Sequence, residues 1–367
     1  MRFWLAGGGT GGHICPGLAL ADELKTLRPE CEIGFLGTNE GLDRELLWGS
    51  GYPLHLLAAG RGSPLNWRHP THAPRFAYAL YQVFRLFRRE RPDVVIAMGG
   101  FAAATPGIMA RMLKIPLVIL EQNTVPGRVN RLLSGWAVEI FSQFEEARNY
   151  FRESPAVFNF SGSPLRGPFL KMCFEPPCDG DALLVVGGSQ GAKRLNEIVA
   201  SAARRIVGET GCKLIHVAGP AHEKEIRSLY QAAGVEAEVY GFHNNMEELY
   251  RRSRLVVARS GAISIAEFAA AGLPAILVPL PSAMDDHQRL NALSLKLSGA
   301  ALSYEETTAS TETFAPLVVS LWKDEKRRAA MAQEMRRTAR PESGSEIAQA
   351  VIKLAERGKA SGKATGK

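Results

Sequence analysis

The stretch GGGTGGHICPG, residues 7–17, decides how the first part of the chain folds. It follows an apolar run at residues 3–6, which predicts a strand, and precedes a run at residues 18–24, which predicts a helix. Three of its glycines match G-x-G-x-x-G, the pattern in which a strand, a glycine loop and a helix bring backbone N–H groups close to an anion. The pattern predicts a phosphate-binding loop and leaves the ligand open.

The second predicted strand argues against a dinucleotide in this loop. In the dinucleotide fingerprint an Asp or Glu closes the second strand, about 20 residues further on, and binds the ribose hydroxyls. Here the second strand, at residues 31–38, closes with Leu36, Gly37 and Thr38, and the nearest carboxylate, Glu40, lies beyond the turn. We therefore expect no nicotinamide or other cofactor, and another kind of phosphate ester in the loop.

The composition is that of a globular protein large enough for two domains. The 367 residues are 46% hydrophobic and 22% charged, and no apolar run reaches the roughly 18 residues that a membrane-spanning helix needs. Glycines interrupt the apolar run after Ala6, so we expect no secretory signal. The five cysteines are scattered without a C-x-x-C pair, which favours a reduced, cytosolic protein without structural zinc.

The net charge of +7 is concentrated in two segments. Residues 353–367 form a Gly/Ala/Lys-rich tail for which we expect disorder, either as a solvated end or in contact with anionic surfaces. Residues 75–92 combine an apolar helical stripe with a cluster of arginines, which suits core packing or, with exposed aromatic side chains, an anionic bilayer surface. The stripe and the cluster are Phe76, Leu80, Val83, Phe84 and Phe87, and Arg85, Arg88, Arg89 and Arg91. We expect no nucleic-acid partner.

Predicted strands alternate with amphipathic helices, and this alternation indicates doubly wound parallel sheets. The pattern breaks into a Pro/Gly/Ser-rich segment near residues 155–168 and restarts with the strand, glycine loop and helix of residues 182–206. We therefore predict an α/β fold of two Rossmann-like domains that face a central cleft, with ligands at the carboxyl ends of the strands. The other strands are expected at residues 31–38, 53–59, 92–100, 116–123, 139–144, 213–219, 236–242, 255–261 and 274–280.

The domain boundaries follow from this plan. We place the first domain at residues 1–163 and the second at residues 164–340. A helical pattern at residues 341–358 is expected to cross back to the first domain, and residues 359–367 are expected to form a disordered basic tail. The duplicated architecture suggests two ligands that are brought together, one per domain.

Six motifs, in the same order over nearly the whole chain, carry a family resemblance. They are GGGTGGHICPG, MGGFAAATPG, EQNTVPGRVNRLL, GSPLR, VVGGSQGAKRLN and RSGAISIAEFAAAGLPAILVPLPSAMDDHQRLNA. The chain resembles the MurG family of peptidoglycan N-acetylglucosaminyltransferases, which have the GT-B fold. The resemblance implies an inverting transfer of N-acetylglucosamine from UDP-GlcNAc to the 4-hydroxyl of MurNAc in lipid I (undecaprenyl-pyrophosphoryl-MurNAc-pentapeptide), giving lipid II. It also implies a peripheral protein on the cytoplasmic face of the inner membrane, near anionic lipid and the cell-wall synthesis machinery.

The resemblance implies a donor site in the second domain. Ser260 is expected to cap a helix whose first N–H groups suit a diphosphate, and Glu267 on that helix would accept hydrogen bonds from both ribose hydroxyls. Gln288 would contact the donor sugar. Asp285 and Asp286 are adjacent, but GT-B enzymes generally need no divalent cation, so we expect no metal. The other residues expected to bind UDP-GlcNAc are Ala262, Ile263, Ser264, Ile265, Ala266, Arg166, Ser189, Gln190 and the backbone at His243.

The first domain is expected to hold the acceptor. An inverting transfer needs a base for the attacking 4-hydroxyl, and His13, with a pKa near neutrality, suits that role. A structural role at the helix start is the alternative for His13, and Glu121 is the second candidate base. Asn123 is expected to position the sugar. The loop residues expected to cradle the lipid pyrophosphate or the donor sugar are Thr10, Gly11 and Gly12.

Three positions depart from the family pattern. Leu120 stands where a His usually precedes Glu-Gln-Asn, Phe101 replaces a frequent Tyr, and Ser282 replaces a frequent His. These departures weaken the expectations about acceptor contacts and leave the donor phosphate site untouched. Two other functions stay open: a related GT-B enzyme that glycosylates another lipid or epimerises a UDP-sugar, and a non-catalytic sugar-nucleotide-binding subunit.

Overall fold

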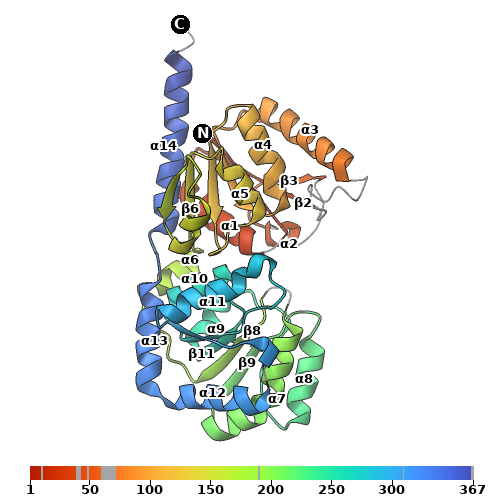
Figure 1. Ribbon diagram of the computed structural model, residues 1–367, viewed down its shortest axis with the longest axis vertical. Coiled ribbons are helices and arrows are strands. Elements are labelled where there is room, and N and C mark those ends of the chain that lie inside the picture. The colour runs from red at the N-terminus through yellow and green to blue at the C-terminus, as the bar shows by residue number, and fades with distance from the viewer. Residues whose placement is uncertain are drawn as a thin grey trace. The chain divides into compact units, whose positions relative to one another are not determined.

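The computed structural model describes residues 1–9, 11–38, 43–47, 49–58, 72–188, 191–308 and 310–364. The chain divides into two compact units, unit 1 with Met1–Arg166 and Arg340–Lys367, and unit 2 with Gly167–Ala339. Each unit contains a parallel sheet flanked by helices (Figure 1), which confirms the predicted α/β, doubly wound fold. Within the described ranges no helix combines the length and the apolar composition needed to cross a membrane.

The sheet of unit 1 reverses its strand order at the first strand. Its strands are β1 (Arg2–Gly7), β2 (Glu32–Thr38), β3 (Leu54–Leu57), β4 (Val94–Gly99), β5 (Leu117–Glu121), β6 (Glu139–Ser142) and β7 (Val157–Phe160). They lie in the order β3-β2-β1-β4-β5-β6-β7, with every neighbouring pair parallel. The gap between the loops that follow β1 and β4 is the topological switch point, where open α/β sheets bind their ligands.

Helices cover both faces of this sheet because both faces are apolar. Phe3 and Leu5 of β1 pack on one face, against residues of α1 and α14, whereas Trp4 and Ala6 pack on the other, against α3 and α4. This alternation is the two-residue period of a strand buried on both sides. The helices of unit 1 are α1 (Gly11–Leu27), α2 (Asp43–Leu47), α3 (His72–Glu90), η1 (Phe101–Ala103), α4 (Ala104–Met112), α5 (Arg128–Ser134), η2 (Glu145–Tyr150) and α14 (Ser343–Ala364).

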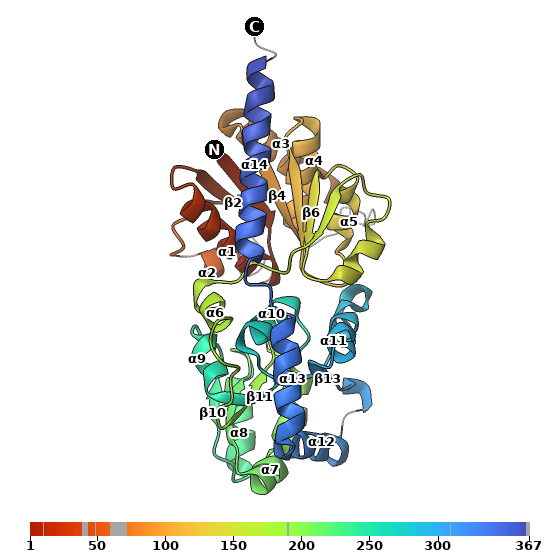
Figure 2. The same ribbon diagram turned by 90° about the vertical axis from the view of Figure 1, so that its left-hand side faces the viewer.

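Helix α14 packs along α1 and the sheet of unit 1 (Figure 2). Its apolar side is buried, with Ile347 and Val351 in the core, and Glu356 forms an ion pair with Arg28 at 3.1 Å. The helix continues to Ala364, beyond residue 358, where the sequence pattern predicts its end. Lysine and alanine favour helix, and Lys359 lies 3.4 Å from the Asp93 carboxylate, which extends the packed part of the helix.

Unit 2 repeats the arrangement with six strands in the order β10-β9-β8-β11-β12-β13, all neighbouring pairs parallel. Its order reverses at β8, so its switch point lies between the loops after β8 and β11. Its strands are β8 (Ala182–Val186), β9 (Lys213–Val217), β10 (Glu238–Tyr240), β11 (Ser253–Ala258), β12 (Ala275–Leu277) and β13 (Ala301–Ser303). Its helices are α6 (Gly167–Met172), α7 (Lys193–Thr210), α8 (Glu223–Ala232), α9 (Met246–Arg251), α10 (Ala262–Ala271), η3 (Met284–Asp286), α11 (His287–Leu297), η4 (Glu306–Thr308), α12 (Thr311–Lys323) and α13 (Glu325–Arg337).

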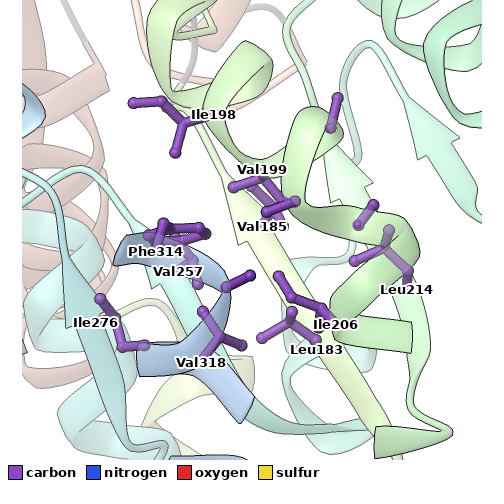
Figure 3. Close-up of a cluster of buried hydrophobic side chains, with 14 of the residues drawn as sticks. Leu183, Val185, Ile198, Val199, Ile206, Leu214, Val257, Ile276, Phe314 and Val318 are labelled. Carbon is purple, nitrogen blue, oxygen red and sulfur yellow. The ribbon is translucent and has the colours of Figure 1, made fainter. Parts of the chain in front are cut away.

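The main core of unit 2 fixes α7 against the sheet. Leu183 and Val185 of β8 lie among side chains from α7 and α12, which cover the same face of the sheet (Figure 3). Val199 and Phe314 are fully buried in this cluster. Because α7 follows β8 directly after the second glycine loop, this packing also fixes where that loop ends.

A buried polar chain crosses the same core. The Asn196 amide donates to the Ala218 carbonyl oxygen at 2.8 Å, so its own oxygen accepts from Nε2 of His216 at 3.0 Å. Nδ1 of the neutral imidazole then accepts from the Tyr230 hydroxyl at 2.6 Å. Burial lowers the pKa of His216 to about 3, so the ring is neutral in the folded protein at physiological pH.

We predict that His216 makes unit 2 less stable in mild acid. Its pKa is lower in the folded chain than the value of about 6.5 in the unfolded chain, so stability is lost as pH falls below about 6.5 and on toward 3. At pH 5 the loss is about 2 kcal/mol, or roughly 4–8 °C in melting temperature for a unit of this size. Differential scanning calorimetry at pH 7.5 and pH 5 should show that His216→Gln melts lower at pH 7.5 and loses less than the parent on acidification. His222→Gln, which removes a half-buried histidine of the same unit, is the control, and an equal acid loss in parent and His216→Gln would contradict the prediction.

Candidate functional site

A buried carboxylate holds the glycine loop of unit 1. Asp43, the first residue of α2, accepts hydrogen bonds from the backbone N–H groups of Gly9 at 2.6 Å and Thr38 at 2.9 Å. A Cβ added at Gly8 would lie 2.2 Å from the Asp43 carboxylate, so a side chain at that position would push the two apart. The sequence analysis missed Asp43, because its contact with the loop spans 34 residues and no spacing rule reports it.

His13 lies between the loops that follow β1 and β4. Its Nδ1 is 3.1 Å from the Gly8 carbonyl oxygen, which can only accept, so Nδ1 carries the proton and a neutral ring has its lone pair at Nε2. A Cβ added at Gly99 would lie 3.0 Å from Nε2, and one added at Gly100 would lie 3.4 Å from Nδ1. These two glycines have φ of 100° and 72°, a region that L side chains rarely adopt. The MGGF motif therefore lets the backbone pass beside the imidazole.

Glu121, at the end of β5, shapes the loop that follows it. Its carboxylate accepts from the backbone N–H groups of Asn123 at 2.9 Å and Gly127 at 3.2 Å, and from Nδ2 of Asn130 at 2.8 Å. The side chain is buried, and this burial raises the pKa of the Glu121 carboxyl against the opposing effect of its donors. The arrangement ties strand β5, the EQN loop and helix α5 together. The role of Asn130 was not predicted from the sequence, although the residue lies in the motif EQNTVPGRVNRLL.

The other predicted site residues of this part of the chain are half-buried or lie outside the described residues. Gly11 and Gly12 open α1 and are half-buried. Arg166 is half-buried at the end of the first segment of unit 1. The predicted positions that lie outside the described residues are Thr10, Ser189 and Gln190.

The predicted cap of α10 is wrong. Gly261 occupies the N-cap position, and as a glycine it has no side chain with which to cap the helix. The Ser260 hydroxyl donates instead to the Gln288 carbonyl oxygen at 2.7 Å, and the Asn291 amide donates to the Ser260 carbonyl oxygen at 3.1 Å. Ser260 thus joins β11 to α11, because α11 offers its hydroxyl a nearby acceptor. A helix start without a side-chain cap at a switch point suits an anion.

Helix α10 carries one carboxylate, Glu267, among mostly apolar side chains. Ala262, Ile265 and Phe268 are buried in unit 2. The half-buried residues of the helix are Ile263, Ser264 and Ala266. Glu267 is only 9% exposed, and the Tyr250 hydroxyl donates to its Oε2 at 2.8 Å. Sequence reasoning found Glu267 and missed Tyr250.

The loop between β12 and α11 is held by side chains of its neighbours. Oε1 of Gln288 accepts a hydrogen bond from the Leu280 backbone N–H at 3.0 Å. The other polar atom of this side chain is the amide nitrogen, which can only donate. The Arg259 guanidinium donates to the carbonyl oxygens of Val278 at 3.1 Å and Pro279 at 3.2 Å, and it forms an ion pair with Glu306. Arg259, immediately before Ser260, thereby fixes the loop next to the start of α10.

Two further predictions concern the edge of unit 2 and a metal. His243 follows β10, with its ring 4.8 Å from the Tyr240 ring, and its neighbour Phe242 is 53% exposed.

Asp285 and Asp286 both have left-handed backbone, with φ of 50° and 57°, and Asp286 forms an ion pair with Arg289. Across the described residues no group of three or more His, Cys, Asp or Glu side chains is placed to hold a metal ion.

Family models match both halves of the chain. The N-terminal domain of glycosyltransferase family 28 matches residues 3–142, and the C-terminal domain of that family matches residues 182–349. Among solved structures, a calicheamicin glycosyltransferase superimposes with a TM-score of 0.70 over 97% of this chain and 98% of its own, at 16% identity, which shows the fold alone.

Two relatives are nearer in sequence. A UDP-N-acetylglucosamine–N-acetylmuramyl-(pentapeptide) pyrophosphoryl-undecaprenol N-acetylglucosamine transferase from Methylococcus capsulatus is 38% identical over 96% of this chain and 99% of its own length. The crystal structure of MurG from Acinetobacter baumannii superimposes with a TM-score of 0.75 over 96% of this chain and 99% of its own, at 29% identity. Identity at this level over the full length of both proteins shows that the chain belongs to the MurG family of N-acetylglucosamine transferases.

Proposed function

We propose that this protein transfers N-acetylglucosamine from UDP-GlcNAc, with inversion, to the 4-hydroxyl of MurNAc in lipid I, giving lipid II for peptidoglycan synthesis. The observation that carries the proposal is membership of the MurG family over the whole chain, with both family 28 domains matched. The geometry adds a candidate ligand site at the switch point of each unit. One unit thus serves the acceptor and the other the donor.

In the proposed reaction the acceptor oxygen attacks the anomeric carbon as the bond from that carbon to UDP breaks. UDP leaves with added negative charge, and the N-terminus of α10, without a side-chain cap, stabilises that charge through its N–H groups and dipole. Glu267 accepts hydrogen bonds from the ribose hydroxyls, and the Gln288 amide nitrogen donates to the sugar. The other donor contacts are assigned to Arg166, Ser189, Gln190 and the backbone at His243, beside the exposed ring of Phe242.

His13 is the better candidate for the base. The Gly8 carbonyl fixes the proton on Nδ1, so Nε2 is the ring nitrogen that takes the proton of the 4-hydroxyl in the proposed reaction. Glu121 is buried and accepts two hydrogen bonds from its own loop and one from Asn130 on α5, which favours a role in positioning Asn123 over direct contact with an acceptor. The glycine loop with Gly11 and Gly12 holds the pyrophosphate.

Product analysis tests the proposal against its alternatives. The full-length protein is incubated with UDP-GlcNAc and a water-soluble lipid I analogue, and the products are separated and their linkage determined. A β-1,4-linked disaccharide together with free UDP supports the proposal. An epimerised UDP-sugar formed without acceptor, transfer only to another lipid, or binding of UDP-GlcNAc without turnover would each replace it with one of the alternatives.

Glu267→Ala is expected to raise the KM for UDP-GlcNAc by about 10- to 100-fold, with a smaller effect on kcat. Two hydrogen bonds to a charged group are lost, each worth roughly 1.5–3 kcal/mol before compensation. Steady-state kinetics with varied donor measure the change. Glu209→Ala, which breaks the exposed Arg205–Glu209 ion pair on α7, is the control. Unchanged donor kinetics in a folded Glu267→Ala protein would remove Glu267 from the ribose site.

His13→Ala is expected to lower kcat by about 10²–10⁴-fold with little change in donor binding, the usual range for loss of a general base. The parent should also lose kcat at acid pH, where the imidazole is protonated, and the variant should lack that dependence. Melting temperatures check whether loss of the Nδ1–Gly8 contact unfolds unit 1. Near-normal turnover at neutral pH would return His13 to a structural role and make Glu121 the next candidate.

The exposed face of α3 is the candidate membrane contact. Val83 and Phe87 are buried, as the core interpretation expected, whereas Phe84 is exposed on the same side as Tyr78 and Tyr81. The Arg85 guanidinium lies 5.9 Å from the centre of the Tyr81 ring. Aromatic rings beside arginines suit the headgroup region of an anionic bilayer. We propose peripheral binding at the cytoplasmic face of the inner membrane, where the polyprenyl chain of the acceptor keeps the substrate.

Arg85→Ser/Arg88→Ser is expected to weaken binding to anionic vesicles by about 10-fold or more, since each basic residue contributes on the order of 1 kcal/mol at an anionic surface. Arg89 is left in place because it pairs with Glu90. Sedimentation with phosphatidylglycerol vesicles at low and high salt measures the effect, and turnover of the water-soluble acceptor should be unchanged. Arg204→Ser/Lys326→Ser removes the same charge from unit 2 as a control. Equal sedimentation of the α3 variant and the parent would show that these arginines are solvent-exposed side chains with no role in membrane binding.

A further inference from the structure

Glu267 is held by a tyrosine from a different helix. The hydroxyl of Tyr250, on α9, donates to Oε2 of Glu267, on α10, at 2.8 Å. Tyr250 is 1% exposed and Glu267 9%, so bulk water competes little for this hydrogen bond. A buried carboxylate without donors is costly, and the phenol hydroxyl stabilises its ionised form in an apolar helix.

The tyrosine ring is itself fixed by aromatic packing. Its centre lies 5.7 Å from the ring of Phe169, on α6, and 5.5 Å from the ring of Phe268, on α10. Both phenylalanines are buried. Three helices therefore set the direction of one hydroxyl, and rotation of the Tyr250 side chain away from Glu267 would open a cavity in the core.

We propose that Tyr250 is a positioning residue for the recognition of the ribose diol of a uridine nucleotide. Its hydroxyl fixes the plane and orientation of the Glu267 carboxylate, so that the carboxylate accepts from the two ribose hydroxyls without first losing rotational freedom. The proposal rests on the proposed function, which assigns Glu267 to the ribose. It adds that the strength of ribose recognition is set by a residue outside the nucleotide site.

The test separates ribose recognition from general damage to the site. Isothermal titration calorimetry on the full-length protein compares UDP with its 2′,3′-dideoxy analogue, which lacks both ribose hydroxyls. Tyr250→Phe is expected to weaken UDP binding by about 5- to 20-fold and binding of the analogue by less than about 2-fold, since a hydrogen-bond acceptor of the diol is misoriented. Phe169→Leu keeps the hydroxyl but loosens the ring, and should reduce the preference for UDP by a smaller factor.

Two further variants make the result specific. Tyr230→Phe removes another buried tyrosine hydroxyl of unit 2, the one bonded to His216, and is expected to keep the parent's preference for UDP over the analogue. Glu267→Gln/Tyr250→Phe is expected to bind UDP as weakly as Glu267→Gln alone, because Tyr250 acts through that carboxylate.

The outcomes distinguish the two assignments. Equal weakening of UDP and the analogue by Tyr250→Phe, or additional weakening in the double variant, would overturn the positioning role and leave the ribose assignment intact. If Glu267→Gln keeps the parent's preference for UDP, the ribose assignment of Glu267 fails and the proposal for Tyr250 fails with it.

Discussion

The reversal of strand order, at β1 in unit 1 and at β8 in unit 2, is the constraint on which the rest of the structure depends. On the two sides of each reversal the right-handed crossovers carry their helices to opposite faces, so the loops diverge and leave the strand ends uncovered. Loop N–H groups at such an edge need acceptors, because a buried and unpaired N–H costs about as much as a lost hydrogen bond. Unit 1 meets this need with two buried carboxylates, Asp43 behind the loop after β1 and Glu121 behind the loop after β5.

Unit 2 supports the loop between β12 and α11 with a guanidinium and a side-chain amide. The guanidinium of Arg259 donates to two carbonyl groups of this loop, and the Gln288 amide accepts from a third residue. Electrostatics give a reason for the difference in the proposed reaction, since a carboxylate beside a departing diphosphate would repel it, whereas a guanidinium and an amide do not. Glu267 stands apart from this scheme. It lies on helix α10, where the Tyr250 hydroxyl donates to it, and the proposed function gives this carboxylate the ribose as its ligand.

The sequence predicts most strand positions, because these depend on local apolar patterns. It does not predict hydrogen bonds between side chains that are far apart in the sequence. Most strands are apolar runs bounded by glycine and proline, and their places were predicted. β7 and β13 were missed because each is short and β7 lies within a Pro/Gly/Ser-rich segment that resembles a hinge. Serine before a helix usually caps it, but the hydroxyl of Ser260 donates instead to the Gln288 carbonyl oxygen on α11. Asn130 and Tyr250 donate to carboxylates that lie 9 and 17 residues away in the sequence, distances at which no periodicity links the two side chains.

The opening glycine motif shows why a local pattern leaves the ligand open. In a dinucleotide-binding fold, the carboxylate at the end of the second strand points outward to the ribose of the ligand. Here Asp43, the second carboxylate after β2, accepts hydrogen bonds from the N–H groups of Thr38 and Gly9 and so faces the protein's own loop. The glycine pressed most closely against it is Gly8, a position that the G-x-G-x-x-G pattern leaves unspecified. Because the first unit uses this carboxylate to hold its own loop, the proposed function assigns the ribose to a different carboxylate, Glu267 of the second unit, which is buried beside Tyr250.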